Sequence, residues 1–130
     1  MSLIGIVQSQ LMGGGVAAVI SGITPHYGEE AELYFGYDVA ISSDGLVMAV
    51  GAINADDAAP NSGRVDVYDW NGTGWTPRNF LTQPSPSNDA NFGSSVSLSS
   101  DGSVLAVGAQ RGTGAWTQSG TAYVYDWFGS

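Results

Sequence analysis

The sequence offers few side chains that could carry out acid–base or nucleophilic chemistry. His26 is the only histidine, cysteine is absent, and the three basic residues are all arginines. His26 could act as a general base, but it stands in Pro25-His26-Tyr27-Gly28 without a serine or aspartate at triad spacing, and no Gly-x-Ser-x-Gly occurs. It is therefore predicted to be an ordinary loop residue. We expect no catalytic residue, no bound cofactor and no enzyme activity.

Oxygen-bearing side chains cluster in one long loop, where calcium is the chemistry to consider. Asn54, Asp56, Asp57 and Asn61 place oxygens close to alternate positions, which could bind Ca²⁺. Calcium takes about six to eight oxygen ligands, more than four residues easily supply. The corresponding loop later in the chain has Arg111 and no carboxylate. We predict a solvated acidic loop and no metal site, with calcium in this loop as the alternative.

The other carboxylates also favour structural interpretations. Glu29, Glu30 and Glu32 could suggest acid–base work on glycosides, but that chemistry needs two groups facing each other across a cleft. Neighbouring positions of one segment point apart, so this run is predicted to be solvated. Asp69 and Asp126 both precede a tryptophan, and they are predicted to cap turns.

Composition indicates one small domain made of strands. The 130 residues, 43% of them hydrophobic, are enough for a single core. Nineteen glycines and a charged fraction of 12%, against about 25% in typical globular proteins, favour strands with tight turns over surface helices. A net charge of −9 repels phosphates, so nucleic acid and anionic membrane surfaces are excluded as partners.

The apolar N-terminal segment does not fit a targeting or spanning element. No lysine or arginine precedes the apolar run, and Gln8, Ser9 and Gln10 interrupt it, so we expect no cleaved signal peptide. The glycines at 13–15 break any run long enough to cross a membrane. Residues 1–14 are predicted to form an arm, hinged at these glycines, that can pack on another chain.

An internal repeat organises the rest of the chain. An offset of 57 residues aligns Phe35 with Phe92 and continues without a gap to the C-terminus, with about half of the aligned positions identical. FGYDVAISSDGLVMAVGA becomes FGSSVSLSSDGSVLAVGA, and SGRVDVYDWNG becomes SGTAYVYDWFG. A period this long is typical of a supersecondary unit whose apolar faces are buried by stacking on its neighbours.

Each unit reads as a series of antiparallel strands. Alternating apolar residues predict a first strand, and Ser-Asp-Gly predicts a tight hairpin turn after it, because aspartate bonds to the backbone ahead and glycine accepts a positive φ. The apolar runs that follow predict second strands buried on both faces. Third strands have one face of small residues and one of larger residues. The predicted strands are 37–41, 46–52, 65–68 and 75–81 in the first unit, and 96–98, 104–109 and 122–125 in the second.

The second unit lacks a fourth strand after its Asp-Trp. Residues 15–25 lie just before the first Phe-Gly, where the fourth strand of a preceding unit would stand, and they are predicted to supply it. The predicted organisation is thus an arm at 1–14 followed by a two-sheet domain at 15–130. Its first unit covers 35–91 and its second 92–130, and the sheets are two four-stranded antiparallel sheets in permuted order.

Aromatic residues could present a surface on which sugar rings stack. Those that recur at equivalent positions are predicted to pack between the two units instead. Trp116 is different, because Ala59 stands at its equivalent position and its loop is polar. Trp116 is therefore the best candidate for a residue that contacts a partner. The residues considered are Tyr34, Tyr68, Trp70, Trp75, Trp116, Tyr123, Tyr125 and Trp127.

The ordered motifs resemble the FG-GAP repeat, the blade unit of integrin α-subunit-type β-propellers. They are Phe-Gly, Ser-Asp-Gly, Ala-Val-Gly-Ala and Val-Tyr-Asp-Trp, and they extend from Phe35 to Trp127. The resemblance implies four-stranded antiparallel blades, usually extracellular and engaged in adhesion or assembly. Ile53 and Gln110 stand where the family often has proline, and the Asp-x-Asp-x-Asp-Gly loop of its calcium-binding members is missing.

Two blades are too few for a closed propeller, which takes about four to eight. They would expose apolar faces and strand edges, so we expect self-association. Trimers or tetramers would close rings of six or eight blades, with residues 15–25 completing a blade of the same chain or of a neighbour. The alternative is a two-sheet stack docked on a larger assembly of other structural proteins.

The function expected from these features is structural. The chain is predicted to be a non-enzymatic, propeller-forming subunit of a larger particle, such as a phage virion tail or head accessory protein, and to be extracellular or virion-associated without a signal peptide. The alternative is an adhesion-type module that recognises a glycan or a protein through its loops, since the long loops differ while the strands match.

Overall fold

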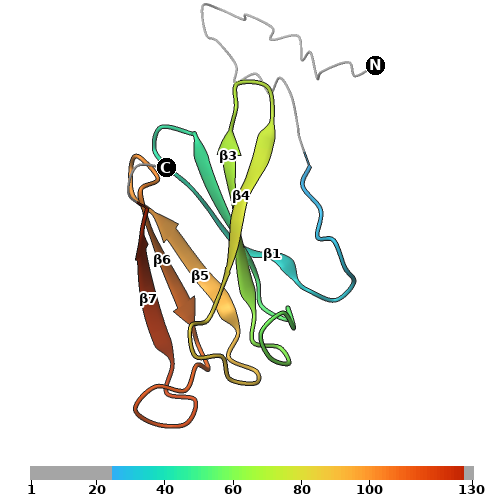
Figure 1. Cartoon of the computed structure of the whole chain (residues 1–130), viewed down its shortest axis with the longest axis vertical. Helices are drawn as coiled ribbons and strands as arrows, with labels where there is room; N and C mark the ends of the chain where they lie inside the picture. The colour runs from blue at the N-terminus through green and yellow to red at the C-terminus, as the bar shows by residue number, and fades with distance from the viewer. Residues whose placement is uncertain (1–24, 128–130) are drawn as a thin grey trace, which may run out of the picture.

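Two antiparallel β-sheets make up the part of the chain that the computed structural model describes, residues 25–127 (Figure 1). The first sheet has the order β1-β2-β3-β4 and the second the order β5-β6-β7. The predicted all-β architecture and all seven strands predicted within this part are confirmed, and no helix here could cross a membrane. The strands are β1 (Phe35–Ile41), β2 (Val47–Ala52), β3 (Arg64–Trp70), β4 (Trp75–Thr82), β5 (Phe92–Leu98), β6 (Val104–Ala109) and β7 (Thr121–Asp126).

The second sheet has three strands in the described part, where four were predicted. The predicted arm, 1–14, lies outside the described residues, and so does the predicted fourth strand, 15–25, apart from Pro25. Both stay predictions. Within residues 25–127 the edge of β7 that faces away from β6 has no neighbouring strand.

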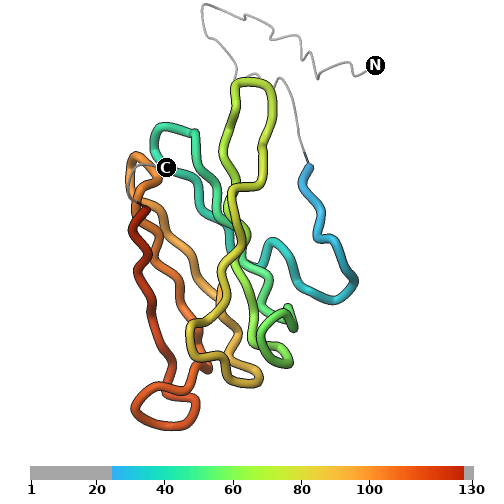
Figure 2. Tube along the Cα trace, in the orientation of Figure 1, coloured from blue at the N-terminus to red at the C-terminus, as the bar shows by residue number. Residues whose placement is uncertain are grey.

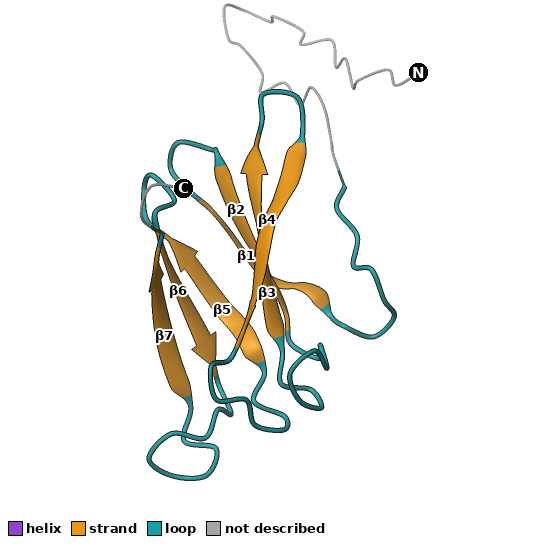
Figure 3. Ribbon diagram, in the orientation of Figure 1, coloured by secondary structure: helices purple, strands orange, loops and turns teal. Residues whose placement is uncertain are grey.

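Turns and long loops gather at opposite ends of the sheets (Figures 2 and 3). The short turns between β1 and β2, β3 and β4, and β5 and β6 lie at one end. The longer connections 53–63, 83–91 and 110–120 lie at the other. The fold therefore presents one end made of tight hairpins and one made of loops.

The predicted Ser-Asp-Gly turns are confirmed in both units. The Asp44 carboxylate accepts hydrogen bonds from Ser42 Oγ at 2.6 Å and from the Leu46 amide at 3.0 Å. Asp101 accepts the equivalent bonds in the second unit, and Gly45 and Gly102 have φ of 75° and 74°. These bonds favour the charged carboxylate, so they lower the pKa of Asp44 and of Asp101 below the usual 3.8.

The two turns make stability depend on acid pH. A carboxyl whose pKa is lower in the folded state stabilises the fold above its unfolded value of 3.8, and this contribution is lost as the pH falls through the folded pKa. We expect the unfolding temperature of the unsubstituted chain to fall further between about pH 5 and pH 2 than that of the double variant Asp44→Asn/Asp101→Asn. The asparagine side chains of the variant still accept the turn hydrogen bonds but do not titrate. Thermal unfolding monitored by circular dichroism measures this, with Glu30→Gln as an exposed control. Parallel pH profiles for the chain and the double variant would refute it.

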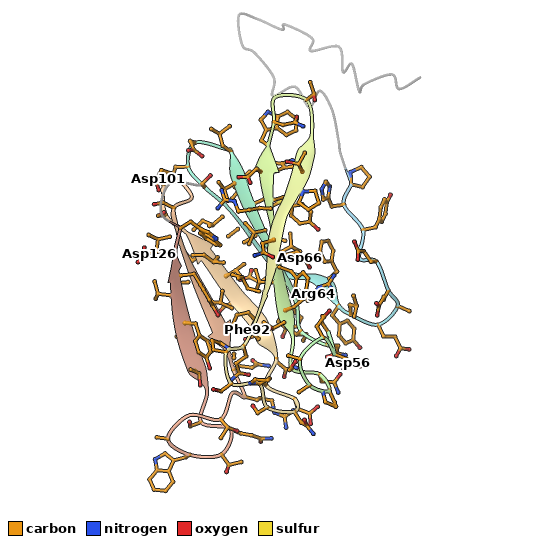
Figure 4. The ribbon with its side chains drawn as sticks, viewed as in Figure 1. Asp56, Arg64, Asp66, Phe92, Asp101 and Asp126 are labelled. Atoms are coloured by element: carbon orange, nitrogen blue, oxygen red, sulfur yellow. The ribbon has the colours of Figure 1, made fainter. Side chains whose placement is uncertain are left out.

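The core lies between the two sheets, with β5 packed against β1 and β2. Strand residues alternate between the faces of a sheet, so one face of each sheet turns toward the other sheet. Phe92 is fully buried there, with its ring 5.7 Å from that of Tyr123 (Figure 4). The buried core residues are Val47, Ala49, Val65, Val67, Phe92, Val96, Leu105, Val107 and Ala109.

Burial differs between β2 and β6, the second strands of the two units, although their sequences match. β2 is buried along nearly its whole length, as predicted. β6 is not, because Ala106 is exposed and Gly108 half-buried. The prediction that both faces of β6 are buried is therefore wrong for the described residues, since no second layer covers the outer face of the second sheet there.

Candidate assembly surfaces

The contact between the two sheets depends on a close approach of their backbones. A Cβ atom at Gly51 of β2 would overlap the carbonyl oxygen of Gly93 in β5, and Gly93 itself has a φ of 95°. Beside them, Gly63 forms a parallel bridge with Phe92, whose amide donates to the carbonyl of Ser62 at 2.8 Å. Glycine is needed at Gly51 and Gly93 because any side chain would push the sheets apart.

Two side-chain hydrogen bonds join the sheets across this contact. Asp38 on β1 accepts from the backbone amide of Val96 at 2.8 Å. Gln83, which follows β4 and is almost completely buried, donates through Nε2 to the hydroxyl of Tyr123 at 3.0 Å. These bonds complement the apolar core because they fix the register of one sheet on the other.

Arg78 on β4 changes the interpretation of Asp69. Arg78 Nη2 lies 2.6 Å from Asp69 Oδ1 in an ion pair. The guanidinium carbon of Arg78 also lies 5.0 Å from the centre of the Trp127 ring. The predicted turn-capping role of Asp69 is therefore wrong: Asn71 caps that turn by accepting from the amides of Thr73 and Gly74. A hydrogen-bonded arginine nine residues away outcompetes the local turn for the Asp69 carboxylate.

Apolar side chains gather on the outer face of the first sheet, turned away from the second sheet. We call this the large-residue face. The register pairs Val39 with Val50 and Ile41 with Met48, which places them on one side, and Val39 and Ile41 are 59% and 58% exposed. A hollow of about 220 Å³ opens over β1 and β2. The residues of this face are Phe35, Val39, Ile41, Met48, Val50 and Tyr68.

A charged cluster borders the large-residue face on β3 (Figure 4). Arg64 Nε lies 3.1 Å from Asp66, and Arg64 Nη1 lies 3.3 Å from Asp57. Burial raises the pKa of Asp66, and the charge of Arg64 opposes that rise. The cluster has one positive charge and two negative ones, so the ion pairs with Arg64 leave it only weakly negative beside the large-residue face.

The outer face of the second sheet carries small side chains. We call it the small-residue face. The register pairs Ser97 with Ala106 and Ala106 with Val124, and Val124 is 68% exposed. Asp126 is exposed at the end of β7, and the turn that it is predicted to cap extends beyond the described residues (Figure 4). The small-residue face consists of Ser95, Ser97, Ala106, Gly108, Ala122 and Val124.

The repeat relates each outer face to an inner face. With the offset of 57 residues, the small-residue face corresponds to Asp38, Ala40, Ala49, Gly51, Val65 and Val67, the inner face of the first sheet. The large-residue face corresponds to Phe92, Val96, Leu98, Leu105, Val107 and Tyr125, the inner face of the second sheet. Each outer face thus repeats most of a surface that is buried between the two sheets, with one clear difference: Asp66, opposite Val50 on β3, stands where the second sheet has Tyr123.

The predicted role of the recurring aromatic residues is only partly right. Tyr125 lies against Phe92 between the sheets, and Trp127 reaches Arg78 of the first sheet. Tyr68, the equivalent of Tyr125, instead turns outward and contacts the ring of His26 at 4.9 Å. No further sheet covers Tyr68 in the described part of the chain.

The acidic residues of the 53–63 loop are engaged with their own surroundings. Asp56 accepts from the amide of Asn61 at 2.6 Å, and Asn61 donates to Asp89 at 3.1 Å. Asp57 pairs with Arg64. Within residues 25–127, no group of three or more histidine, aspartate or glutamate side chains is placed to hold a metal ion.

Other candidate residues lie at the surface. Glu29, Glu30 and Glu32 are all exposed, which agrees with the predicted solvated run. His26 is half-buried in an irregular segment, as predicted for a loop histidine. Trp116 is 79% exposed in the loop between β6 and β7. Its role as a partner contact stays a prediction.

The sequence predicted exposed apolar faces but did not identify the residues that form them. Their signal was present, since alternate positions of β2 and β6 carry small residues in both copies, as Ala49 and Ala106 do. It was missed because a pattern within one unit does not reveal which face the neighbouring unit covers. The ion pair of Asp69 with Arg78 was also missed, because Arg78 has no equivalent in the second unit.

Comparison with known proteins agrees with this architecture. No curated protein matches the chain. The family model described as FG-GAP repeat matches residues 23–68 and 75–125. The second match begins at β4 and ends in β7, so its repeat unit starts earlier than the predicted units at 35–91 and 92–130. Since the two matches include most of the chain, this protein belongs to the FG-GAP repeat family.

Proposed function

We propose that this chain is a non-enzymatic structural module that assembles through its two outer faces into a larger propeller-type structure. FG-GAP repeats form propeller-type binding or structural modules. One observation carries the proposal: the chain exposes two faces whose repeat equivalents are buried against each other. Exposed apolar faces of this kind mark interaction surfaces.

The contacts made by the polar side chains favour a structural role over catalysis. The charged side chains at the large-residue face form an ion-paired cluster centred on Arg64, and the loop carboxylates hold their own loop together. Catalytic sites usually combine a nucleophile with an oriented base, and His26 contacts an aromatic ring. A location outside the cell or in a virion stays a prediction.

The native mass of the full-length chain tests this function. We expect light scattering coupled to gel filtration to give a mass above that of one 13.4 kDa chain, falling toward one chain on dilution. The mass also distinguishes a trimer from a tetramer, which would form rings of six and eight blades respectively. A mass of one chain at every concentration would contradict the proposal.

A second candidate function is recognition of a glycan or a protein by the loop end. It is favoured by the 79% exposure of Trp116 on a loop of a rigid scaffold. We expect Trp116→Ala to abolish binding on a glycan array and to leave the unfolding temperature unchanged. Thr113→Ala, in the same exposed loop, is the matched control. An array without signal for the unsubstituted chain would remove this candidate for glycans.

A further inference from the structure

We propose that the small-residue face of one copy of this chain binds the large-residue face of the next copy, in the register that joins the two sheets within the chain. The inference rests on the proposed function and names its partner, a second copy bound head to tail. A surface that fits each outer face is present on the chain itself. Three contacts that join the two sheets inside the chain have repeat equivalents on the two outer faces.

The first contact is the approach of two backbones. Inside the chain, Gly51 lies against Gly93, and their repeat equivalents are Gly108 on the small-residue face and Gly36 beside the large-residue face. Gly36 has a positive φ of 91°, close to the 95° of Gly93, and no atom beyond its chain neighbours lies within 4 Å of the position where its Cβ would stand. A Cβ at Gly108 would meet only serine side chains. Both outer faces therefore carry the glycine that the contact needs: Gly36 is open, and Gly108 is covered only by the Ser95 hydroxyl, which can rotate away.

The second contact lies at the hairpin end. Gly102, in the turn between β5 and β6, packs on the side chain of Val47, and the amide of Asp44 donates to the carbonyl of Ser100 at 3.1 Å. The equivalents of Gly102 and Val47 are Gly45 and Val104. The Cβ position of Gly45 also has no heavy atom within 4 Å. The turn of the first sheet is thus open to receive Val104 of another copy.

The third contact is a hydrogen bond that is expected to be weaker between copies than inside the chain. Two copies should therefore separate more easily than the two sheets of one chain. Asp38 accepts the amide of Val96 inside the chain, whereas Ser95 stands at the equivalent position on the small-residue face, opposite Val39 of the next copy. A hydroxyl forms a weaker hydrogen bond than a carboxylate. It also adds no negative charge between two chains that each carry −9.

A contact between two different faces is heterologous, so repeating it does not stop at a dimer and builds a ring when the rotation between copies closes. This predicts a specific behaviour for variants in which one face is blocked by arginine. Ala106→Arg blocks the small-residue face, and Val39→Arg blocks the large-residue face. Both positions are exposed, so the fold of the single chain tolerates the change.

The experiment measures native mass for each full-length variant and for their mixture. We expect each variant alone to have the mass of one chain, because every copy lacks one of the two faces. An equimolar mixture retains one intact pair of faces, so we expect a complex of two chains and nothing larger. Ala115→Arg, an exposed alanine in the 110–120 loop, is the matched control and keeps the mass of the unsubstituted chain.

Other outcomes overturn the inference and separate it from the proposed function. If the unsubstituted chain is monomeric, both fail. If it assembles but one variant alone still forms dimers, the faces pair with themselves, so the head-to-tail arrangement is wrong while the structural function stands. If both variants assemble normally, other surfaces hold the copies together and the inference fails. Circular dichroism and unfolding temperature of each variant verify that the single chains remain folded.

Discussion

Replacing Phe92 by alanine is expected to lower the free energy of unfolding by about 3–5 kcal/mol, the usual cost of removing a buried phenylalanine. Phe92 is fully buried between the two sheets, and Tyr123 and Tyr125 surround its ring. Its side chain is the largest completely buried one in the described part of the chain. Neighbouring side chains cannot collapse into the space because the backbones of Gly51 and Gly93 already touch.

The chain contains a matched control for this substitution. Phe35 is the repeat equivalent of Phe92, but it lies half-buried on the large-residue face. In the Ala106→Arg background, in which we expect the copies to stay apart, Phe35→Ala is expected to lower the free energy of unfolding clearly less than Phe92→Ala. Urea unfolding followed by tryptophan fluorescence measures both. Equal losses would mean that Phe92 does not hold the two sheets together.

The strands could be predicted from the sequence because their signals are local. Alternation and the apolar run predict β1 and β2, and Ser-Asp-Gly predicts the turn between them. The repeat then gives the same elements a second time. Asp44 and Asp101 bond within their own turns, and for this reason their roles were predictable without knowledge of the fold.

Contacts between distant residues could not be predicted in this way. Asp38 bonds to an amide 58 residues away, and no pattern in either segment indicates that pairing. Ala49 and Ala106 occupy the same place in identical motifs, yet one is buried and the other exposed. Which copy of a repeated surface is covered depends on the position of the copy in the stack. For this reason the sequence predicted that exposed apolar faces exist but did not show which residues form them.

Replacing Gly51 by alanine is the second change with a large expected effect. The new Cβ would overlap the carbonyl oxygen of Gly93, and a backbone atom cannot rotate away as a side chain can. The two sheets must therefore move apart, with a loss of about 1–3 kcal/mol, the usual cost of overpacking a core. We expect a lower unfolding temperature and weaker hydrogen-exchange protection along β2 and β5.

Gly108→Ala is the matched substitution at the equivalent position, and it separates stability from assembly. Its Cβ meets the Ser95 hydroxyl, which can rotate, so the unfolding temperature of the single chain is expected to change little. Between copies, however, the same Cβ would meet Gly36 of the next chain, and the native mass is expected to fall to that of one chain. An unchanged native mass, with Gly51→Ala destabilised as expected, would show that copies do not meet in the register of the two sheets. The pair of variants thus tests the internal contact and its proposed repetition with one methyl group each.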